Sequence, residues 1–130
     1  MTDPQQLLIQ YWGYGSFRAP QQEIIQALVS HQDVLAVLPT GSGKSLCYQV
    51  PGLINEGICV VISPLVALME DQVNDLMGRN IKAVALTGPQ SPEEMMRIFD
   101  LFRHGGYKFL YLAPERLKQE LVREFLKTIS

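Results

Sequence analysis

Cysteine and histidine are scarce in this chain of 130 residues, which contains two of each. Cys47 and Cys59 lie in apolar stretches, so we expect reduced, buried thiols rather than a disulfide framework. His31 and His104 stand alone, without the spacing of metal ligands. No apolar run reaches the roughly 18 residues that span a membrane, and the first residues lack the pattern of a secretory signal. A disulfide scaffold, a histidine metal centre and a membrane protein are therefore not expected.

A strong excess of one charge is also missing. The formal net charge is −2 and the sequence pI is about 5.6, so the chain as a whole is not a basic nucleic-acid binder. Most lysines and arginines fall in residues 79–130, and this mildly basic half is compatible with a contact to phosphates, although most of these charges are expected on solvated helix faces. Apolar residues make up 47%, which indicates one globular domain with a real core.

What the chain does contain is a glycine loop placed between a strand and a helix. The loop follows the apolar run 34–38 and precedes the helix-compatible run 46–50. Its glycines allow successive N–H groups to point at phosphate oxygens, and the helix N-terminus adds further donors. Lys44 would reach the β- and γ-phosphates as the catalytic cation, and Ser45 would ligate Mg²⁺. The predicted nucleotide-binding residues of this loop are Thr40, Gly41, Ser42, Gly43, Lys44 and Ser45.

Apolar runs alternate with helical segments along the chain, and none of the runs alternates with polar residues. This pattern predicts an α/β fold: a parallel sheet with right-handed crossovers and helices on both faces. Pro51 is expected to kink or break the helix that contains it. The predicted strands are 34–38, 58–62, 83–86 and 109–112. The predicted helices start at Asp3-Pro4 and at Pro20 and cover 44–54, 66–79, 92–104 and 118–129.

Ligands of such sheets bind at the carboxyl ends of the strands. This rule makes three loops that follow strands candidates for a shared ligand-binding site: 39–45, 63–65 and 113–117. For the last two, an ordinary helix start is the alternative, because Ser before Pro and Pro in a first turn are common there. For the first, the alternative is a plain strand–helix turn.

The ordered set of motifs resembles the first part of a RecQ-type DNA helicase of superfamily 2. Trp-Gly-Tyr at 12–14 with Phe-Arg-Ala-Pro-Gln at 17–21 resembles the upstream adenine motif of that family. The loop 39–45 with the following Leu-Cys-Tyr-Gln resembles its phosphate-binding motif. Ser-Pro-Leu at 63–65 and Ala-Pro-Glu-Arg-Leu at 113–117 resemble its next two motifs. The resemblance implies a P-loop NTPase of the RecA-like fold.

Residue roles follow from the resemblance by position. Tyr14 and Arg18 would sandwich adenine, and Gln21 would read the edge of the base, since an amide offers one donor and one acceptor. Taken by themselves, an aromatic and an arginine four residues apart are more often packing and solvent contacts. The residues implied to lie along a nucleic-acid strand, mostly on phosphates, are Ser63, Pro64, Leu65, Pro114 and Arg116.

One part of an ATPase site has no counterpart in the sequence. ATP hydrolysis needs an acidic pair at a strand end, and no Asp-Glu dipeptide occurs here. Residues 1–130 are therefore expected to form the amino-terminal portion of the first motor domain, with an incomplete sheet, weak ATP binding and no hydrolysis of their own.

The resemblance also implies the context of the whole protein. It would be a 3′–5′ DNA helicase that uses ATP and Mg²⁺ and acts on single strands and duplex junctions. It would lie in the cytoplasm of a bacterium or the nucleus of a eukaryote, with no membrane partner. A small P-loop kinase and a non-catalytic nucleotide-binding module remain alternatives.

Overall fold

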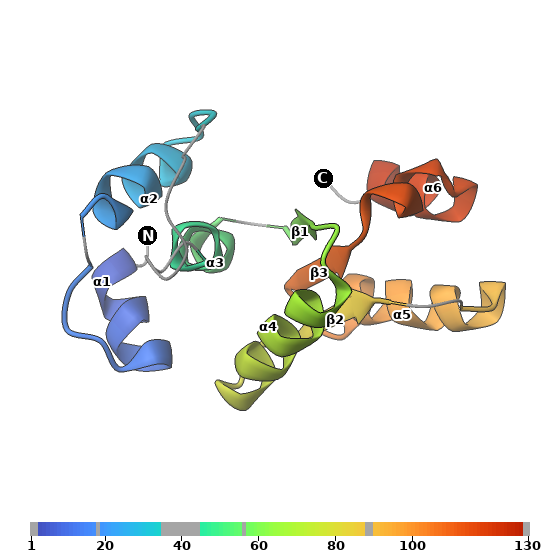
Figure 1. Cartoon of the computed structure of the whole chain (residues 1–130), viewed down its shortest axis with the longest axis horizontal. Helices are drawn as coiled ribbons and strands as arrows, with labels where there is room; N and C mark the ends of the chain where they lie inside the picture. Colours follow the sequence, from blue (N-terminus) through green and yellow to red (C-terminus); the bar gives the residue numbers. More distant parts are fainter. Residues whose placement is uncertain (1–2, 18, 35–44, 56, 88–89, 129–130) are drawn as a thin grey trace. The chain divides into compact units, whose positions relative to one another are not determined.

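The computed structural model describes residues 3–17, 19–34, 45–55, 57–87 and 90–128. The chain divides into two compact units, Met1–Glu56 and Gly57–Ser130. The described part of the first unit is helical, and the second unit contains the sheet (Figure 1). No helix among the described residues is long and apolar enough to cross a membrane.

The first unit begins with the helix that the Asp3-Pro4 signal predicts. Helix α1 (Pro4–Leu7) continues directly into a wider π-helical turn, η1 (Leu8–Trp12). The Asp3 carboxylate caps α1 by accepting a hydrogen bond of 3.2 Å from the Gln5 N–H. Gly13 ends the helical segment with a φ of 75°, a left-handed conformation that glycine adopts without strain.

Two further helices complete the described part of this unit. Helix α2 (Gln21–Val29) starts directly after Pro20, as predicted, and α3 (Leu46–Ile54) follows Ser45. Both α1 and α2 pack against α3. Their apolar sides meet in a small core whose buried side chains are Leu7, Leu8, Trp12, Ile25, Leu46, Cys47 and Val50.

The second unit is built on a parallel sheet of three short strands. The strands are β1 (Cys59–Ile62), β2 (Ala83–Leu86) and β3 (Phe109–Leu112), in the order β1-β3-β2. The register aligns Val60 and Val84 with Leu110 of the central strand. All four residues of β3 are buried, as expected for a strand covered on both faces. The predicted parallel α/β architecture is confirmed.

Helices lie on both faces of the sheet. One face, with Leu86, Leu110 and Leu112, packs against α5 (Pro92–His104) and α6 (Glu120–Thr128). Helix α4 (Val66–Gly78) contacts β2 and β3. Because side chains alternate along a strand, Phe109 and Tyr111 face away from the α5–α6 core. A short 3₁₀ turn, η2 (Pro114–Lys118), joins β3 to α6.

Apolar side chains are exposed beside β1, which is an edge strand of the three-stranded sheet. Ile62 is 49% exposed and Leu65 is 59% exposed, and Val66 and Leu68 at the start of α4 are each 45% exposed. We refer to these four residues as the β1 apolar patch.

Two helix predictions need correction. Of the kink or break expected at Pro51, the break does not occur, since α3 continues through Pro51 to Ile54. The carbonyl of Pro51 accepts a bond of 2.9 Å from the Asn55 N–H at the end of this helix. The last helix does not start at Lys118, which belongs to η2; α6 starts at Glu120 because Gln119 is extended (φ −77°, ψ 130°). Of the predicted strand 34–38, Val34 lies outside regular structure, and 35–38 lie outside the described residues.

Candidate functional site

The glycine loop falls almost entirely outside the described residues, which resume at Ser45. Thr40, Gly41, Ser42, Gly43 and Lys44 therefore have no structural description. Ser45 lies directly before α3, where its carbonyl accepts hydrogen bonds of 3.3 Å from the Tyr48 N–H and 2.9 Å from the Gln49 N–H. Its side chain makes no capping bond to this helix. A serine hydroxyl that is not used by its own helix, at the helix N-terminus, fits the predicted contact with Mg²⁺ and phosphate.

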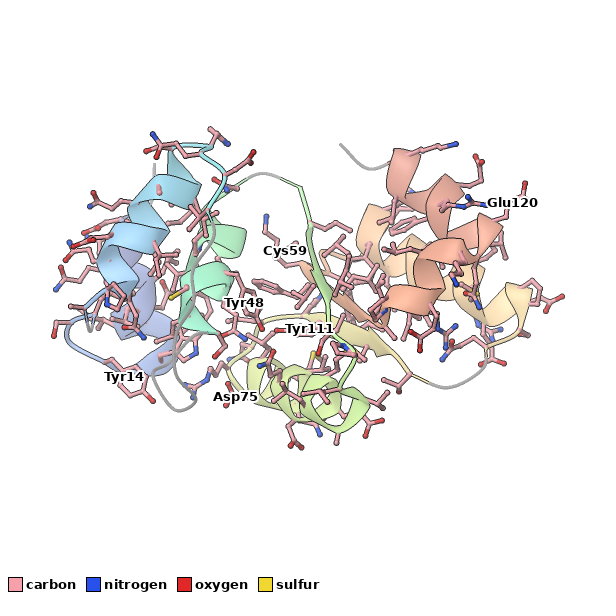
Figure 2. All side chains as sticks on the ribbon, turned by 45° about the horizontal axis from the view of Figure 1, so that its top comes forward. Tyr14, Tyr48, Cys59, Asp75, Tyr111 and Glu120 are labelled. Atoms are coloured by element: carbon pink, nitrogen blue, oxygen red, sulfur yellow. The ribbon has the colours of Figure 1, made fainter. Side chains whose placement is uncertain are left out.

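The predicted adenine residues are placed differently from one another. Tyr14 is 51% exposed on the surface of the first unit (Figure 2), whereas Gln21 is only 3% exposed. Gln21 is the first residue of α2, and its side chain lies inside the unit. Arg18 lies outside the described residues. Their joint contact with adenine stays a prediction.

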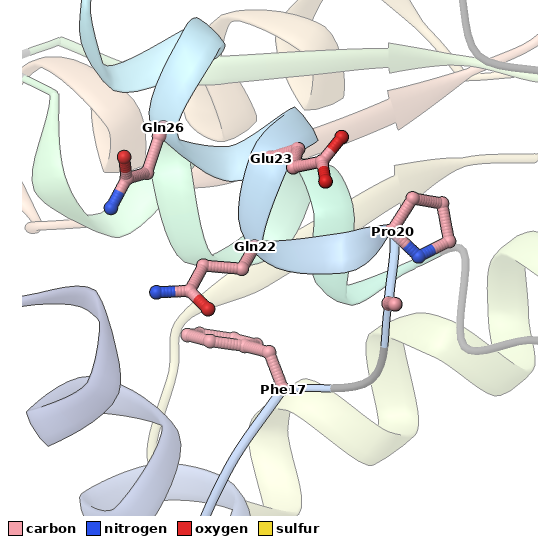
Figure 3. Close-up of a pocket in the computed structure, with 6 residues that line it drawn as sticks. Phe17, Pro20, Gln22, Glu23 and Gln26 are labelled. Carbon is pink, nitrogen blue, oxygen red and sulfur yellow. The ribbon is translucent and has the colours of Figure 1, made fainter.

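A pocket of about 280 Å³ lies at the start of α2. Figure 3 shows the carboxamide of Gln22 beside the ring of Phe17, with Pro20 and Glu23 also at the start of α2. Gln21 is not among the lining residues. The residues that line the pocket are Phe17, Ala19, Pro20, Gln22, Glu23 and Gln26.

In the second unit, the structure brings two of the predicted loops together. Because the strands are parallel, Ser63 after β1 and Ala113 after β3 lie at the same edge of the sheet, the one formed by the carboxyl ends of the strands. The Ser63 N–H donates to the Leu112 carbonyl at 3.0 Å, which extends the β1–β3 ladder into the loops. The Ser63 hydroxyl in turn accepts from the Leu65 N–H at 3.2 Å and holds the start of α4. Pro64, Leu65 and Pro114 are exposed at this edge, and Ser63 is half-buried.

Arg116 is the exception among the predicted nucleic-acid residues. Only 9% of this residue is exposed, and its Nη1 donates to Oε1 of Gln119 at 3.4 Å. The motif therefore presents its proline to solvent, whereas its arginine is buried.

A polar cluster after β2 lies at the same edge and was missed from the sequence. The Thr87 hydroxyl donates to the Glu70 carboxylate of α4 at 3.2 Å, and the Gln90 amide donates to the Thr87 carbonyl at 3.1 Å. The other amide atom of Gln90, Oε1, is buried and has no partner within the described parts of the chain. The rule that ligands bind at the carboxyl ends of parallel strands applies to all three strands, and it points to Thr87 directly after β2.

The two thiols are free, as predicted; Cys47 is buried, as expected, whereas Cys59 is only half-buried. Burial raises the pKa of Cys59 to about 11, and the ammonium of Lys108 offsets this only in part. Burial also raises the pKa of Cys47. Because the thiolate is the reactive form, both are inert at neutral pH. The described residues contain no cluster of His, Cys, Asp and Glu side chains that could hold a metal ion.

Residues 18–130 match the family described as DEAD/DEAH box helicase. The chain belongs to that family. The match covers α2, α3 and the whole second unit, so the edge with Ser63 and Pro114 lies within a helicase domain, while Tyr14 lies upstream of the matched residues.

Individual helicases are similar over nearly the whole chain. The probable ATP-dependent DNA helicase RecS of Bacillus subtilis is 48% identical over 130 residues, covering 99% of this chain and 26% of that protein. The ATP-dependent DNA helicase RecQ of Synechocystis is 45% identical, covering 98% and 27%. The yeast ATP-dependent helicase SGS1 is 40% identical over 105 residues, or 78% of this chain and 7% of that protein. The RecQ-type resemblance is confirmed, and the chain spans about a quarter of the length of the first two relatives.

Proposed function

We propose that the chain is the nucleotide-binding part of an ATP-dependent DNA helicase motor. In the whole protein, ATP hydrolysis drives translocation in the 3′–5′ direction and unwinding of DNA. The observation that carries this proposal is the edge of the parallel sheet at Ser63 and Ala113, within a domain of the helicase family. Open α/β sheets bind their ligands at the carboxyl ends of the strands.

The nucleotide is held by the first unit. Tyr14 and Arg18 stack on the two faces of adenine, and Gln21 bonds to its edge. Thr40, Gly41, Ser42 and Gly43 surround the phosphates with backbone N–H groups, and Lys44 contacts the β- and γ-phosphates. Support in the described residues comes from Ser45, which lies at the N-terminus of α3 and whose hydroxyl does not cap that helix.

Magnesium fits the same place. A bound Mg²⁺ neutralises phosphate charge and takes oxygen ligands, and the Ser45 hydroxyl offers one. The acidic pair that would complete the Mg²⁺ site and orient the attacking water has no counterpart here, since the sequence contains no Asp-Glu pair. This chain by itself therefore holds ATP weakly and does not hydrolyse it.

The DNA strand runs along the loops of the second unit. Pro64, Leu65 and Pro114 are exposed at this edge of the sheet, where the Ser63 N–H donates to the Leu112 carbonyl. Contacts there are made mainly to the sugar–phosphate backbone, so the chain binds single strands and duplex junctions without sequence preference.

A titration of the chain with a fluorescent ATP analogue and Mg²⁺ tests the nucleotide site. Lys44→Ala should weaken binding at least tenfold, about what the loss of one charge-assisted phosphate contact costs. Ser45→Ala should remove most of the dependence on Mg²⁺. Ser30→Ala is the matched control, since Ser30 is exposed at the end of α2. Equal affinity of the wild type and Lys44→Ala would contradict the proposal.

A further inference from the structure

Arg116 lies in the turn that follows the central strand, and its burial is unusual for a residue expected to touch DNA. The turn η2 is closed by two backbone bonds of 3.0 Å, from the Arg116 N–H to the Ala113 carbonyl and from the Gln119 N–H to the Arg116 carbonyl. The guanidinium adds a third bond, from Nη1 to Oε1 of Gln119. Arg116 therefore connects to both ends of the turn.

Gln119 is the junction between this turn and the last helix. Its backbone is extended, and its carbonyl accepts a hydrogen bond of 3.1 Å from the Arg123 N–H in the first turn of α6. By holding the Gln119 side chain, Arg116 fixes where α6 begins relative to the end of β3.

Helix α6 is in turn anchored in the core. Val122 and Phe125 are buried, and the Phe125 ring stacks on Phe99 with centroids 4.1 Å apart and planes 7° apart. The η2 turn is thus held between a buried strand and a buried helix face. For Arg116 to reach a phosphate, its guanidinium would have to give up its hydrogen bond to Gln119 and its buried position.

Lys118 offers a cation in the same turn that can reach a phosphate without leaving a buried position. It is exposed, and it takes part in none of the ion pairs found among the described residues. An ammonium on a flexible stem meets a phosphate as a point charge and needs no fixed geometry.

We propose that Arg116 is a positioning residue of the η2 turn and that Lys118 makes the phosphate contact there. This inference rests on the proposed DNA-binding function. It gives the two cations of the η2 turn different roles: Arg116 holds the turn in place, and Lys118 binds the phosphate backbone of the DNA.

The salt dependence of single-stranded DNA binding separates these roles. Each phosphate contact contributes about 0.7 to the slope of log K against log salt concentration for single strands, which corresponds to about fivefold in affinity at 0.1 M salt. Binding of a labelled oligodeoxythymidine by the whole protein is measured from low to high salt. Lys118→Gln should lower the slope by about 0.7. Arg116→Gln should weaken binding several-fold with the slope unchanged, and Gln119→Ala should do the same because it removes the partner of Arg116.

Two further variants serve as controls. Lys127→Gln changes an exposed cation at the far end of α6 and should leave affinity and slope unchanged. Arg116→Lys keeps the charge but loses the fork geometry, so it should behave like Arg116→Gln.

Two results would overturn the inference. A slope reduced by about 0.7 in Arg116→Gln and restored in Arg116→Lys would make Arg116 the phosphate contact. An unchanged slope in Lys118→Gln would exclude Lys118, and this variant tests that point even if Arg116→Gln does not fold. Absence of DNA binding by the wild-type protein would instead overturn the proposed function, and the inference with it.

Discussion

Replacing Phe125 tests the packing that holds the η2 turn in place. The residue is 1% exposed, its ring stacks on Phe99 at 4.1 Å, and it meets Phe102 edge-on at 6.2 Å. The Arg103 guanidinium lies 5.4 Å from the ring centroid. Aromatic pairs contribute about 0.5–1.5 kcal/mol beyond area burial, and a shape change in a packed core costs up to about 1.5 kcal/mol. Phe125→Leu should therefore lower the free energy of unfolding by roughly 1–3 kcal/mol.

Urea unfolding followed by far-UV circular dichroism measures this loss. Glu124→Ala changes the adjacent residue of the same helix, which is exposed, and should stay within about 0.5 kcal/mol of the wild type. If Phe125→Leu and Glu124→Ala lost the same amount, the stacked arrangement of α5 and α6 would be wrong.

Three further predictions follow from particular contacts. Ser91→Ala should cost about 1 kcal/mol of unfolding free energy, because the Ser91 hydroxyl caps α5 by accepting from the Glu94 N–H at 3.2 Å; no change in urea midpoint would contradict that cap. Burial raises the pKa of Cys59 to about 11 from an ordinary 9.0, so its alkylation by iodoacetamide should be slow at pH 8, rise about tenfold per pH unit and level off only above about pH 11; rapid modification of the folded chain at pH 8 would refute its burial. The 130-residue chain should show no Lys44-dependent release of phosphate from ATP, and a measurable turnover lost in Lys44→Ala would show that the missing acidic pair is not needed.

The sequence predicted the elements better than the orientation of polar side chains. Apolar runs without alternation correctly indicated the buried parallel strands, and the Asp3-Pro4 signal correctly marked a helix start, because these patterns act locally. The strand-end rule correctly placed Ser63 and Ala113 at one edge.

The features that the sequence does not predict depend on contacts between residues that are distant in the chain. Pro51 is tolerated within a helix that its neighbours bury, and local propensity does not contain that packing. The burial of Arg116 depends on Gln119 and on the docking of α6, and the burial of Gln21 depends on the packing of α2 in the first unit. A motif predicts which residue types occur together; whether each one faces solvent depends on tertiary contacts.

Unwinding by the whole protein tests the central claim most directly. A DNA duplex with a 3′ single-stranded tail is incubated with ATP and Mg²⁺, and strand separation is compared for the wild type and Lys44→Ala, with a 5′-tailed duplex as the substrate control. The account predicts ATP-dependent separation of the 3′-tailed duplex that Lys44→Ala abolishes. Separation that persists in Lys44→Ala, or no separation by the wild type under any of these conditions, would contradict it.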